Sequence, residues 1–525
     1  MIIDSRRRGL LLLVWVVVFC AAMPEALAAT HPNIVYILAD DLGFGDVSCY
    51  NDQSKVQTPH VDRLAAEGMR FTDAHTPSAV CTPTRYGILT GRYAWRTRLK
   101  YRVLDGLDPA LIDRDQLTVP SLLKQQGYHT ACVGKWHLGM QWTDTDGQRV
   151  PAVPIDRKTR PRDGRNVDYT KPITDGPTDR GFDYFFGISA SLNMSPFCFI
   201  ENDRPVRLPV WDQPEIRTEF VSVDAGVRSP DFTIAGVMPR LAGEAIGYLE
   251  ERSRYDEPFF LYAPLTSPHL PLAPNQEYVG TSDAGVYGDF VAETDAFVGA
   301  VLETLDRTNL AKNTLVVFTS DNGGLYHYWK PSEKDDVQFY RERARGAYVK
   351  QFGHQGNAHL RGTKADIWEG GHRVPFVVRW PGKVPAGSVS GQLIELTDLL
   401  ATCGQIVDVP LPPGAAPDSK SILPALLSES PTEPVRDFAV HHSLWGTFAI
   451  RRGQWKMIPH RGSGGFTFPK TIDVAKVGGP PGQLYDLEND PSETNNVWQQ
   501  HPAVVAQLQQ LLDDVQAAED RVISN

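Results

Sequence analysis

The sequence predicts an α/β protein: a large doubly wound mixed sheet sandwiched by helices, followed by a smaller C-terminal α+β domain with an antiparallel sheet. Apolar strand patterns alternate with helical patterns from residue 33 to residue 324, which is typical of the doubly wound class. The pattern changes after a proline-rich stretch at 409–424. A chain of 525 residues is long enough for one large domain and a smaller one.

The first strand is predicted at residues 33–39, "NIVYILA", because a continuous apolar run is typical of a parallel strand buried on both faces. A helix follows, with Thr58 as its N-cap, Pro59 at its first position and Gly68 as its stop. Residues 117–139 repeat the unit as a helix, a glycine break at Gly127 and a strand.

Further strands are predicted in "EPFFLYAPL" at 257–265 and "NTLVVFTSDNGG" at 313–324. Residues 289–310 lie between them and predict a helix. Its apolar stripe comprises Phe290, Val291, Phe297, Val298, Val301 and Leu305.

The C-terminal part has a different pattern. Residues 438–458 predict antiparallel strands with a hairpin turn near Arg452-Gly453, and residues 502–520 predict an amphipathic helix. We therefore place a domain boundary near residue 430, which gives a catalytic domain at 29–430 and a C-terminal subdomain at 431–525.

The N-terminus predicts a signal peptide over residues 1–28. Three arginines precede an apolar run of fourteen residues, and "ALA" at 26–28 offers a cleavage site. An uncleaved membrane anchor is the alternative, but the run is short for a membrane span, and no later segment is long enough for one. We expect an exported protein, periplasmic or secreted, without a stable membrane span after cleavage.

Charge and cysteine content exclude two further classes. The net charge of −11 argues against a nucleic-acid partner. The six cysteines are scattered without a C-x-x-C pair, which excludes a zinc ribbon and predicts no disulfide framework. The pairing of Cys49, Cys132, Cys198 and Cys403 stays open. The exported chain keeps five cysteines, an odd number, so one of them can have another role.

Two long polar segments interrupt the α/β pattern, at 141–180 and 325–363. Loops of this length in a compact domain are functional or solvated insertions. The first segment is rich in arginine and lysine. It is either a solvated insertion or a pocket wall that favours anionic substrates.

Acidic residues follow two predicted strands at their carboxyl ends, where ligands bind in open α/β sheets. Asp40 and Asp41 follow the first strand, and Asp321 and Asn322 follow "TLVVFTS". An Asp-Asp pair alone is typical of a turn. Two such pairs together offer only hard oxygen ligands, which suit Ca²⁺ or Mg²⁺ and not zinc.

Several single residues are ambiguous by themselves. Cys81 lies near a predicted helix start with Arg85 one turn later, which suits either a core thiol or a thiolate nucleophile. Lys135 and His137 share one face at a strand end, where they can bind an anion and transfer a proton. Taken alone, His269 lies between prolines and is typical of a structural histidine. Lys364, taken alone in its glycine-flanked loop, is typical of a solvated lysine.

Together, these stretches resemble the type I sulfatases of the alkaline phosphatase superfamily. The similarity covers nearly all of the exported chain. It rests on "PNIVYILADDLGFGD", "CTPTRYGILTGR", "GYHTACVGKWHLG", "SPHLP", "TSDNGG", "GTKADIWEGGHRVPFVVRWPG" and "LYDLENDPSETNN". The resemblance implies an alkaline phosphatase-like fold and sulfuric ester hydrolase activity of the arylsulfatase type.

The resemblance also implies that Cys81 is oxidised to formylglycine (3-oxoalanine) by a formylglycine-generating enzyme. The hydrated aldehyde has one hydroxyl to attack sulfur and another whose collapse expels sulfate, whereas a sulfated thiol has no easy exit. A divalent metal, Ca²⁺ or else Mg²⁺, is implied to be bound by residue 81 together with Asp40, Asp41, Asp321 and Asn322.

The other roles are carried over from the family in the same way. Arg85 is implied to stabilise the hydrated aldehyde, and Lys135 and Lys364 to neutralise charge on the sulfuryl oxygens. His137 is implied to assist collapse of the covalent intermediate, and His269 to donate a proton to the departing oxygen. Ser191 is expected to line the sulfate pocket.

The substrate class expected from the resemblance is a sulfated saccharide or another small sulfate ester, such as an aryl sulfate. Two alternatives stay open at this point. One is a phosphonate or phosphodiester hydrolase that uses the same modified residue. The other is an inactive carbohydrate-binding relative, against which the complete set of ligands and bases argues.

Overall fold

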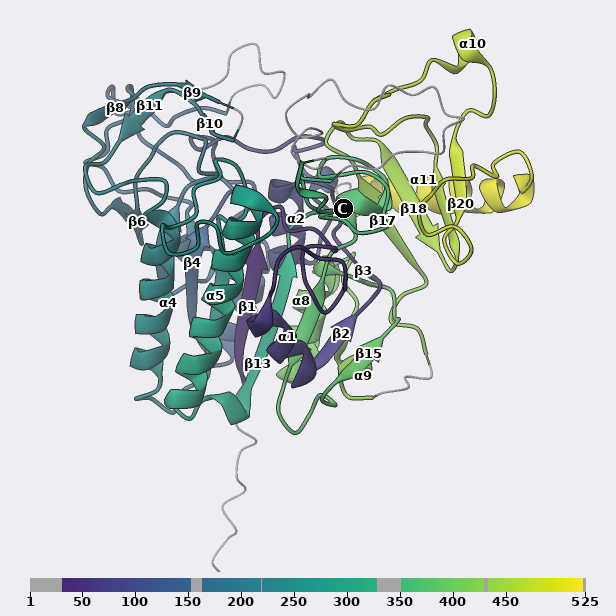
Figure 1. Ribbon diagram of the computed structural model, residues 1–525. Coiled ribbons are helices and arrows are strands. Elements are labelled where there is room, and N and C mark those ends of the chain that lie inside the picture. The colour runs from purple at the N-terminus through teal and green to yellow at the C-terminus, as the bar shows by residue number, and fades with distance from the viewer. Residues whose placement is uncertain (1–30, 153–162, 219, 328–350, 429–432, 523–525) are drawn as a thin grey trace, which may run out of the picture. The chain divides into compact units, whose positions relative to one another are not determined.

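The computed structural model describes residues 31–152, 163–218, 220–327, 351–428 and 433–522. Its central feature is a ten-stranded mixed sheet (Figure 1). The strand order is β15 (Ser388–Ser390), β2 (Met69–Phe71), β14 (Phe376–Arg379), β13 (Thr314–Ser320), β1 (Asn33–Ala39), β12 (Phe259–Pro264), β4 (His129–Lys135), β5 (Tyr184–Ile188), β6 (Ile200–Glu201) and β7 (Arg204–Pro205).

The middle of this sheet is parallel. β1 pairs in parallel with β13 on one side and β12 on the other, and β4 continues the parallel run to β5. β14 pairs antiparallel with β13. The predicted mixed α/β sheet is therefore confirmed, and the strands expected at 33–39, 257–265 and 313–324 form its centre.

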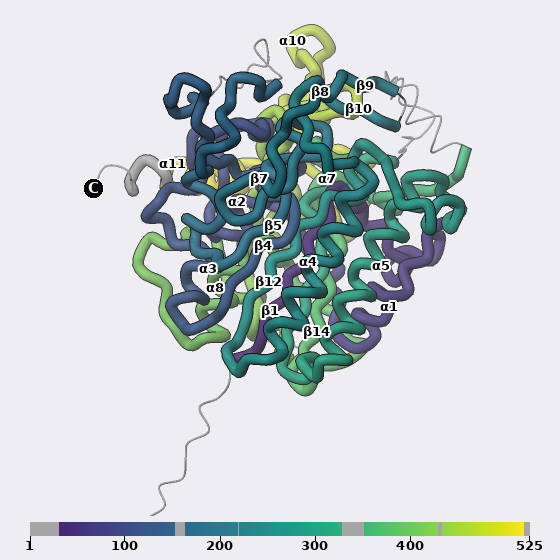
Figure 2. The backbone as a smooth tube through the Cα atoms, turned by 90° about the vertical axis from the view of Figure 1, so that its left-hand side faces the viewer, coloured from purple at the N-terminus to yellow at the C-terminus, as the bar shows by residue number. Residues whose placement is uncertain are grey.

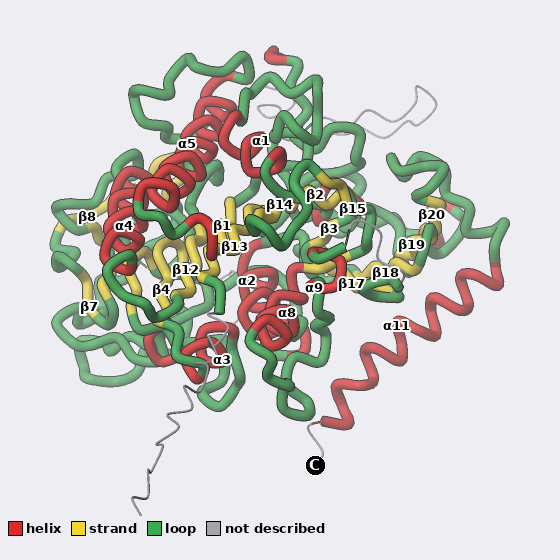
Figure 3. Tube along the Cα trace, turned by 90° about the horizontal axis from the view of Figure 1, so that it is seen from below, coloured by secondary structure: helices red, strands yellow, loops and turns green. Residues whose placement is uncertain are grey.

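Helices cover both faces of the sheet, as Figures 2 and 3 show. One face carries α1 (Pro59–Ala66), α4 (Val237–Arg252) and α5 (Gly285–Arg307). The other carries α2 (Cys81–Thr90), α3 (Val119–Gln125) and α8 (Leu399–Ile406). β1 alternates between the two layers: Ile34, Tyr36 and Leu38 belong to one core cluster and Val35, Ile37 and Ala39 to the other.

The predicted helices are present, but α5 (Gly285–Arg307) begins and ends a few residues before the predicted 289–310. α1 begins at Pro59 after the N-cap Thr58, but the Thr58 hydroxyl makes no capping bond and instead accepts a hydrogen bond of 2.9 Å from the Ser48 amide. Gly127, with φ of 82°, separates α3 from β4 as expected. All six residues of the predicted stripe in α5 are buried.

The C-terminal region forms a separate four-stranded antiparallel sheet. Its strands are β17 (Phe438–His442), β18 (Phe448–Arg452), β19 (Trp455–Ile458) and β20 (Gln483–Asp486), and α11 (Pro502–Val522) packs against it. The hairpin expected at Arg452-Gly453 joins β18 to β19, with Gly453 at φ of 56°. Residues 31–525 form one compact unit, so the boundary near residue 430 stays a prediction.

Short elements complete the described chain. They are β3 (Ala74–His75), β8 (Trp211–Gln213), β9 (Ile216–Arg217), β10 (Ser222–Val223), β11 (Gly226–Arg228), β16 (Ile394–Glu395), α7 (Glu369–His372), α9 (Leu423–Leu426), α10 (Val474–Val477), and the 3-10 turns η1 (Ala94–Arg96), η2 (Pro177–Arg180), η3 (Ala311–Asn313) and η4 (Leu396–Asp398).

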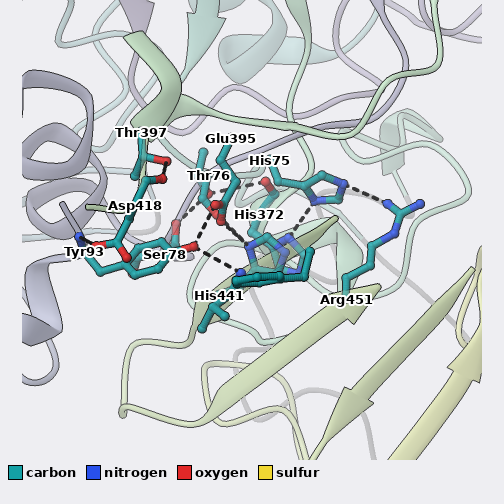
Figure 4. Close-up of polar contacts among 12 residues, drawn as sticks. His75, Thr76, Ser78, Tyr93, His372, Glu395, Thr397, Asp418, His441 and Arg451 are labelled. Atoms are coloured by element: carbon teal, nitrogen blue, oxygen red, sulfur yellow. Dashed lines mark hydrogen bonds and ion pairs between the residues drawn. The ribbon is translucent and has the colours of Figure 1, made fainter. Parts of the chain in front are cut away.

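A buried histidine cluster (His75, His372 and His441) joins the large sheet region to the C-terminal sheet (Figure 4). Lys456 Nζ on β19 lies 2.9 Å from His372 Nε2 and donates to it. His372 Nδ1 lies 3.0 Å from His75 Nδ1, and His75 Nε2 lies 2.9 Å from Asp73 Oδ1 and 3.0 Å from the Arg451 guanidinium. The His441 ring stacks on His372 with centroids 4.0 Å apart. His372 and His75 thus form a hydrogen-bonded chain between Lys456 and Asp73, and His441 packs against it.

The described residues bear on two further features, the pairing of the cysteines and membrane crossing. The five cysteines among them, Cys49, Cys81, Cys132, Cys198 and Cys403, are all free. None of the helices in the described ranges is both long and apolar enough for a membrane crossing. The predicted signal peptide at 1–28 lies outside the described residues.

Candidate active site

The carboxyl ends of β1 and β13 bring the two acidic pairs together. Ala39 and Ser320 are register partners, so Asp40-Asp41 and Asp321-Asn322 leave the sheet side by side. The Asp41 amide donates to Asp321 Oδ1 at 3.2 Å, and Asn322 Nδ2 donates to Asp41 Oδ1 at 2.8 Å. All four side chains are buried. The cluster predicted from the two strand ends is therefore formed.

Three buried cations balance these carboxylates. Lys135 Nζ lies 2.6 Å from Asp40 Oδ2, and Lys364 Nζ lies 2.8 Å from Asp41 Oδ2. The Arg85 guanidinium lies 2.8 Å from Asp321 Oδ2. Buried charges persist only when they are paired in this way. The sequence around Lys364, taken alone, predicts a solvated side chain. In the structure this lysine is a buried partner of the acidic cluster.

The charge balance shifts several pKa values. Burial acts to raise the pKa of Asp40, but Lys135 and the other nearby cations hold it well below its ordinary value. Burial and the neighbouring Asp40 carboxylate raise the pKa of Asp321. Burial acts to lower the pKa of Lys364, and Asp41 outweighs it and keeps the ammonium charged.

Oxygen atoms remain available for a cation. Asp40 Oδ1 and Asn322 Oδ1 are buried and have no hydrogen-bond partner within the described part of the chain. Buried polar atoms are normally satisfied, so orphaned oxygens beside further carboxylates point to a missing ligand. Hard oxygen donors at one point suit Ca²⁺ or Mg²⁺, and the residues therefore fit a divalent metal.

A cavity of about 210 Å³ opens beside this cluster. Four of the predicted catalytic residues line it, together with Ser191 and the predicted metal ligand Asp41. These residues are Asp41, Cys81, His137, Ser191, His269 and Lys364, and Cys81 is also a predicted metal ligand. Arg85 and Lys135 lie behind the wall, where they contact Asp321 and Asp40.

Cys81 is the first residue of α2, a helix whose ten residues are all buried. Burial raises the pKa of the Cys81 thiol, although Lys135 and Lys364 act in the opposite direction. A raised pKa disfavours the thiolate, so the unmodified side chain is a poor nucleophile here. This argues against the thiolate alternative.

Both site histidines present an unprotonated nitrogen. His137 Nε2 donates to the Leu104 carbonyl at 2.9 Å, and its Nδ1 lacks a partner among the described residues. Burial and Lys135 lower the pKa of His137 well below its ordinary value. His269 Nδ1 contacts the Leu270 carbonyl, and its Nε2 lies 3.7 Å from Asp41 Oδ2. Burial and Lys364 lower the pKa of His269 to about 4.

Backbone strain gathers around the cavity. Asp41, His137 and Arg102 line it with φ values of 68°, 55° and 64°, and Ala365 follows Lys364 with φ of 79°. Non-glycine residues in the left-handed region cost about 1–2 kcal/mol each and persist where the surroundings fix them. Three of these four strained residues, Asp41, Arg102 and His137, have side chains that line the cavity.

The basic segment at 141–180 does not form the cavity wall in its described part. Arg149 and Arg180 both pair with Asp175, and Arg165 pairs with Asp163 and Asp212. Residues 153–162, which carry Arg157, Lys158, Arg160 and Arg162, lie outside the described residues, as do 328–350 of the second polar segment.

Sequence reasoning missed cavity residues from elsewhere in the chain. Arg102, Asn193, Trp445 and Phe466 also line the cavity. Only the Trp445-Gly446 pair carries a local signal, as a turn between two predicted strands. Asn193 begins an N-x-S sequon, which does not predict a place in the cavity. Arg102 and Phe466 have no distinguishing sequence context.

Comparison with known proteins identifies the class. A family model described as Sulfatase matches residues 32–409, and one described as N-sulphoglucosamine sulphohydrolase, C-terminal, matches residues 363–518. The chain therefore belongs to the sulfatase family and is a sulfuric ester hydrolase. This family generally uses formylglycine and a divalent metal.

Individual relatives agree over most of the chain. An N-acetylgalactosamine-6-O-sulfatase of Bacteroides thetaiotaomicron is 35% identical, over 92% of this chain and 93% of its own length. Human arylsulfatase A is 30% identical, over 89% of this chain and 84% of its own. A solved sulfatase structure from a study of glycosaminoglycan metabolism by Bacteroides thetaiotaomicron matches with a TM-score of 0.77 and 33% identity, covering 93% of this chain and 100% of that one.

Proposed function

We propose that this sulfatase removes sulfate from a sulfated saccharide, with formylglycine at position 81 and Ca²⁺ at the acidic cluster. The observation that carries the proposal is the meeting of Cys81, Lys364 and two histidines in one cavity beside Asp41. The 35% identical relative is named for a sulfated sugar, which supports a saccharide substrate.

Asp40, Asp41, Asp321 and Asn322 would hold the metal together with residue 81. The orphaned oxygens of Asp40 and Asn322 support this assignment, since each would gain a partner. When bound, the divalent ion supplies Lewis-acid polarisation of the sulfate and lowers the pKa of a nearby hydroxyl.

Formylglycine at position 81 would supply, once hydrated, a hydroxyl that attacks sulfur and a second hydroxyl that allows sulfate to leave. The N-terminus of α2 places residue 81 at the positive end of the helix dipole, which favours a developing oxyanion. Arg85, one turn later on the same helix, would hold the hydrated side chain in orientation.

The two lysines would stabilise the sulfuryl oxygens. Lys364 lines the cavity, and Lys135 lies directly behind it against Asp40. Fixed cations in a buried site stabilise charge that develops in the transition state more strongly than water does. Ser191, whose buried hydroxyl lacks a partner among the described residues, would donate to the sulfate.

The histidines would transfer the protons. His137 Nδ1 is an unprotonated acceptor in the cavity, suited to remove a proton as the intermediate collapses. His269 Nε2 is unprotonated in the free enzyme because of burial and Lys364. The negative charge of a bound sulfate ester favours protonation of His269, which then donates to the leaving oxygen.

Two measurements test the proposal. Mass spectrometry of the peptide that contains residue 81 is expected to show an aldehyde in active preparations; an intact cysteine would refute the formylglycine assignment. Sulfate release from defined sulfated monosaccharides and disaccharides, compared with an aryl sulfate, is expected to give the higher kcat/KM on a saccharide. Cleavage of the aryl sulfate alone would refute the saccharide substrate.

We also propose that the chain is exported, with cleavage after Ala28, and that a formylglycine-generating enzyme modifies Cys81. N-terminal sequencing of the protein from its native host is expected to begin at Ala29. Expression without a formylglycine-generating enzyme is expected to give protein with Cys81 unmodified and no turnover. Full activity of such protein would refute the proposed maturation.

A further inference from the structure

The C-terminal sheet reaches the catalytic cavity through the loop between β17 and β18, residues 443–447. Leu444 and Trp445 of this loop line the same 210 Å³ cavity as Cys81 and Lys364. The cavity is therefore completed by residues more than three hundred positions beyond the modified cysteine in the chain.

Backbone hydrogen bonds fix this loop to the catalytic region. The Leu444 amide donates to the Ala365 carbonyl at 3.0 Å, next to Lys364. The Arg102 amide donates to the Leu444 carbonyl at 2.9 Å, and the Ser443 amide donates to Thr447 at 2.9 Å within the loop. The loop is thus bonded both to the lysine segment and to the segment that carries Arg102.

An apolar cluster in the cavity wall supports the same contact. Val80, Ala365 and Leu444 are buried together, with Val103 and Phe466 packed against them. Val80 precedes Cys81 and Ala365 follows Lys364, so this packing sets the position of the loop relative to the reacting residues. Side chains on such a loop occupy a defined place in the cavity.

Arg102 and Trp445 form a pair at the cavity wall. The guanidinium carbon of Arg102 lies 4.4 Å from the ring centroid of Trp445, and 43% of Trp445 is exposed. Arg102 has a left-handed backbone with φ of 64°, and its side chain lines the cavity. A partly exposed indole with a guanidinium stacked over its ring places an apolar surface and a planar cationic fork at one point of the cavity wall.

We propose that Arg102 and Trp445 form a saccharide-binding subsite next to the reacting sulfate, specific for a substrate with a second anionic group. Trp445 contacts the apolar C–H face of the sugar ring. Arg102 binds a carboxylate or sulfate on the same or the adjacent sugar, because its fork matches planar and tetrahedral anions. This inference rests on the proposed saccharide substrate and adds the polyanionic character of that substrate.

The test compares three substrates on the holoenzyme: an aryl sulfate, a singly sulfated monosaccharide and a sulfated disaccharide with a uronate. Trp445→Ala is expected to lower kcat/KM for both saccharides about ten-fold more than for the aryl sulfate, mainly through KM. Arg102→Ala is expected to lower kcat/KM on the order of ten- to a hundred-fold more for the disaccharide than for the monosaccharide. Trp445→Phe and Arg102→Lys should each recover part of the loss.

Matched controls come from an Arg–Trp pair that does not line the cavity and from a surface arginine. Arg228 lies over the exposed Trp211 at 5.1 Å, and Arg307 forms a surface ion pair with Glu250. Trp211→Ala and Arg307→Ala are expected to leave the ratios between substrates unchanged. Equal losses of the Trp445 or Arg102 variants on all three substrates would assign the pair a purely structural role and overturn the subsite.

Binding separates this inference from the proposed function. Calorimetric titration of the disaccharide into Cys81→Ala is expected to give a Kd that rises about ten-fold when Trp445→Ala is added. If wild type cleaves the disaccharide and the variants bind and cleave it equally well, only the subsite is refuted. If wild type cleaves the aryl sulfate but neither binds nor cleaves any saccharide, both are refuted.

Discussion

Lys364 Nζ donates a hydrogen bond of 2.8 Å to Asp41 Oδ2, although 323 positions separate the two residues in the chain. The ammonium thus lies against a proposed metal ligand and also lines the cavity where sulfate would bind. Under the proposed function, one cation would therefore serve the acidic cluster and the substrate at once.

Replacement of this lysine tests both roles. Lys364→Ala is expected to lower kcat by about 10²–10³, because a fixed cation near the sulfuryl oxygens is lost. It also leaves the buried Asp41 without its partner, at a cost of about 3–5 kcal/mol of unfolding free energy. Steady-state kinetics and thermal unfolding measure the two effects.

Lys124→Ala is the control, because Lys124 is half exposed and pairs with Asp183 away from the site. Its expected effect on stability is about 0–1 kcal/mol, and its kcat should match wild type. A Lys364→Ala enzyme with wild-type kcat would contradict the assignment.

Removal of divalent metal is expected to abolish turnover and to lower the melting temperature. A ligand that binds only the folded state stabilises it by about 2.7 kcal/mol at a hundred times its Kd. Differential scanning fluorimetry with chelator, Ca²⁺ and Mg²⁺ measures the shift and shows which ion restores it.

Asp321→Asn should lose most of the Ca²⁺-dependent shift in melting temperature. Asp212→Asn changes a carboxylate that pairs with Arg165 outside the site, and it should keep the full shift. The metal assignment fails if both variants respond to Ca²⁺ as wild type does.

Cys81→Ala is expected to abolish turnover while leaving thermal unfolding similar to wild type. The side chain supplies the proposed nucleophile after modification, and its loss removes little buried volume. Cys403→Ala is the matched control, since Cys403 is also a buried free thiol but lies on α8. Retained sulfatase activity in Cys81→Ala would disprove the role of this position.

The histidine cluster predicts that stability falls in mild acid. Burial, with Lys456 and neighbouring histidines, lowers the pKa of His372 and His441 well below 6.5, whereas Glu369 acts in the opposite direction. The rings stay neutral in the folded protein and gain protons on unfolding. The free energy of unfolding that depends on these neutral rings is therefore fully present above about pH 6.5. It falls as the pH drops below that value, by up to about 1.4 kcal/mol per pH unit for each histidine.

Urea unfolding between pH 7.5 and 5 measures this slope. Other charged groups face the cluster, namely Asp73, Arg451, Glu395 and Glu493. The test therefore compares the pH dependence of the unfolding free energy in wild type and in His441→Phe. This variant keeps a ring against His372 and removes one titrating group, so its slope should be shallower than that of wild type. An identical slope would exclude His441 as a contributor.

Much of the catalytic site was predictable because its residues lie at the ends of strongly patterned elements. Asp40 and Asp321 each follow a continuous apolar strand, and parallel strands deliver their ends to one edge of a sheet. Cys81 and Arg85 are one helical turn apart, a spacing that is local to α2. Local periodicity and chain direction were sufficient for these residues.

The sequence by itself determined the elements and the family and supplied the proposed set of reactive residues, because strand and helix periods and short motifs are local properties of the chain. Only the tertiary structure decided that Trp445 and Arg102 share the cavity with Cys81 and that His75, His372 and His441 meet. These contacts depend on how the C-terminal sheet packs on the larger one. That packing is fixed by buried apolar contacts and hydrogen bonds between distant segments, which leave no periodic pattern in the sequence.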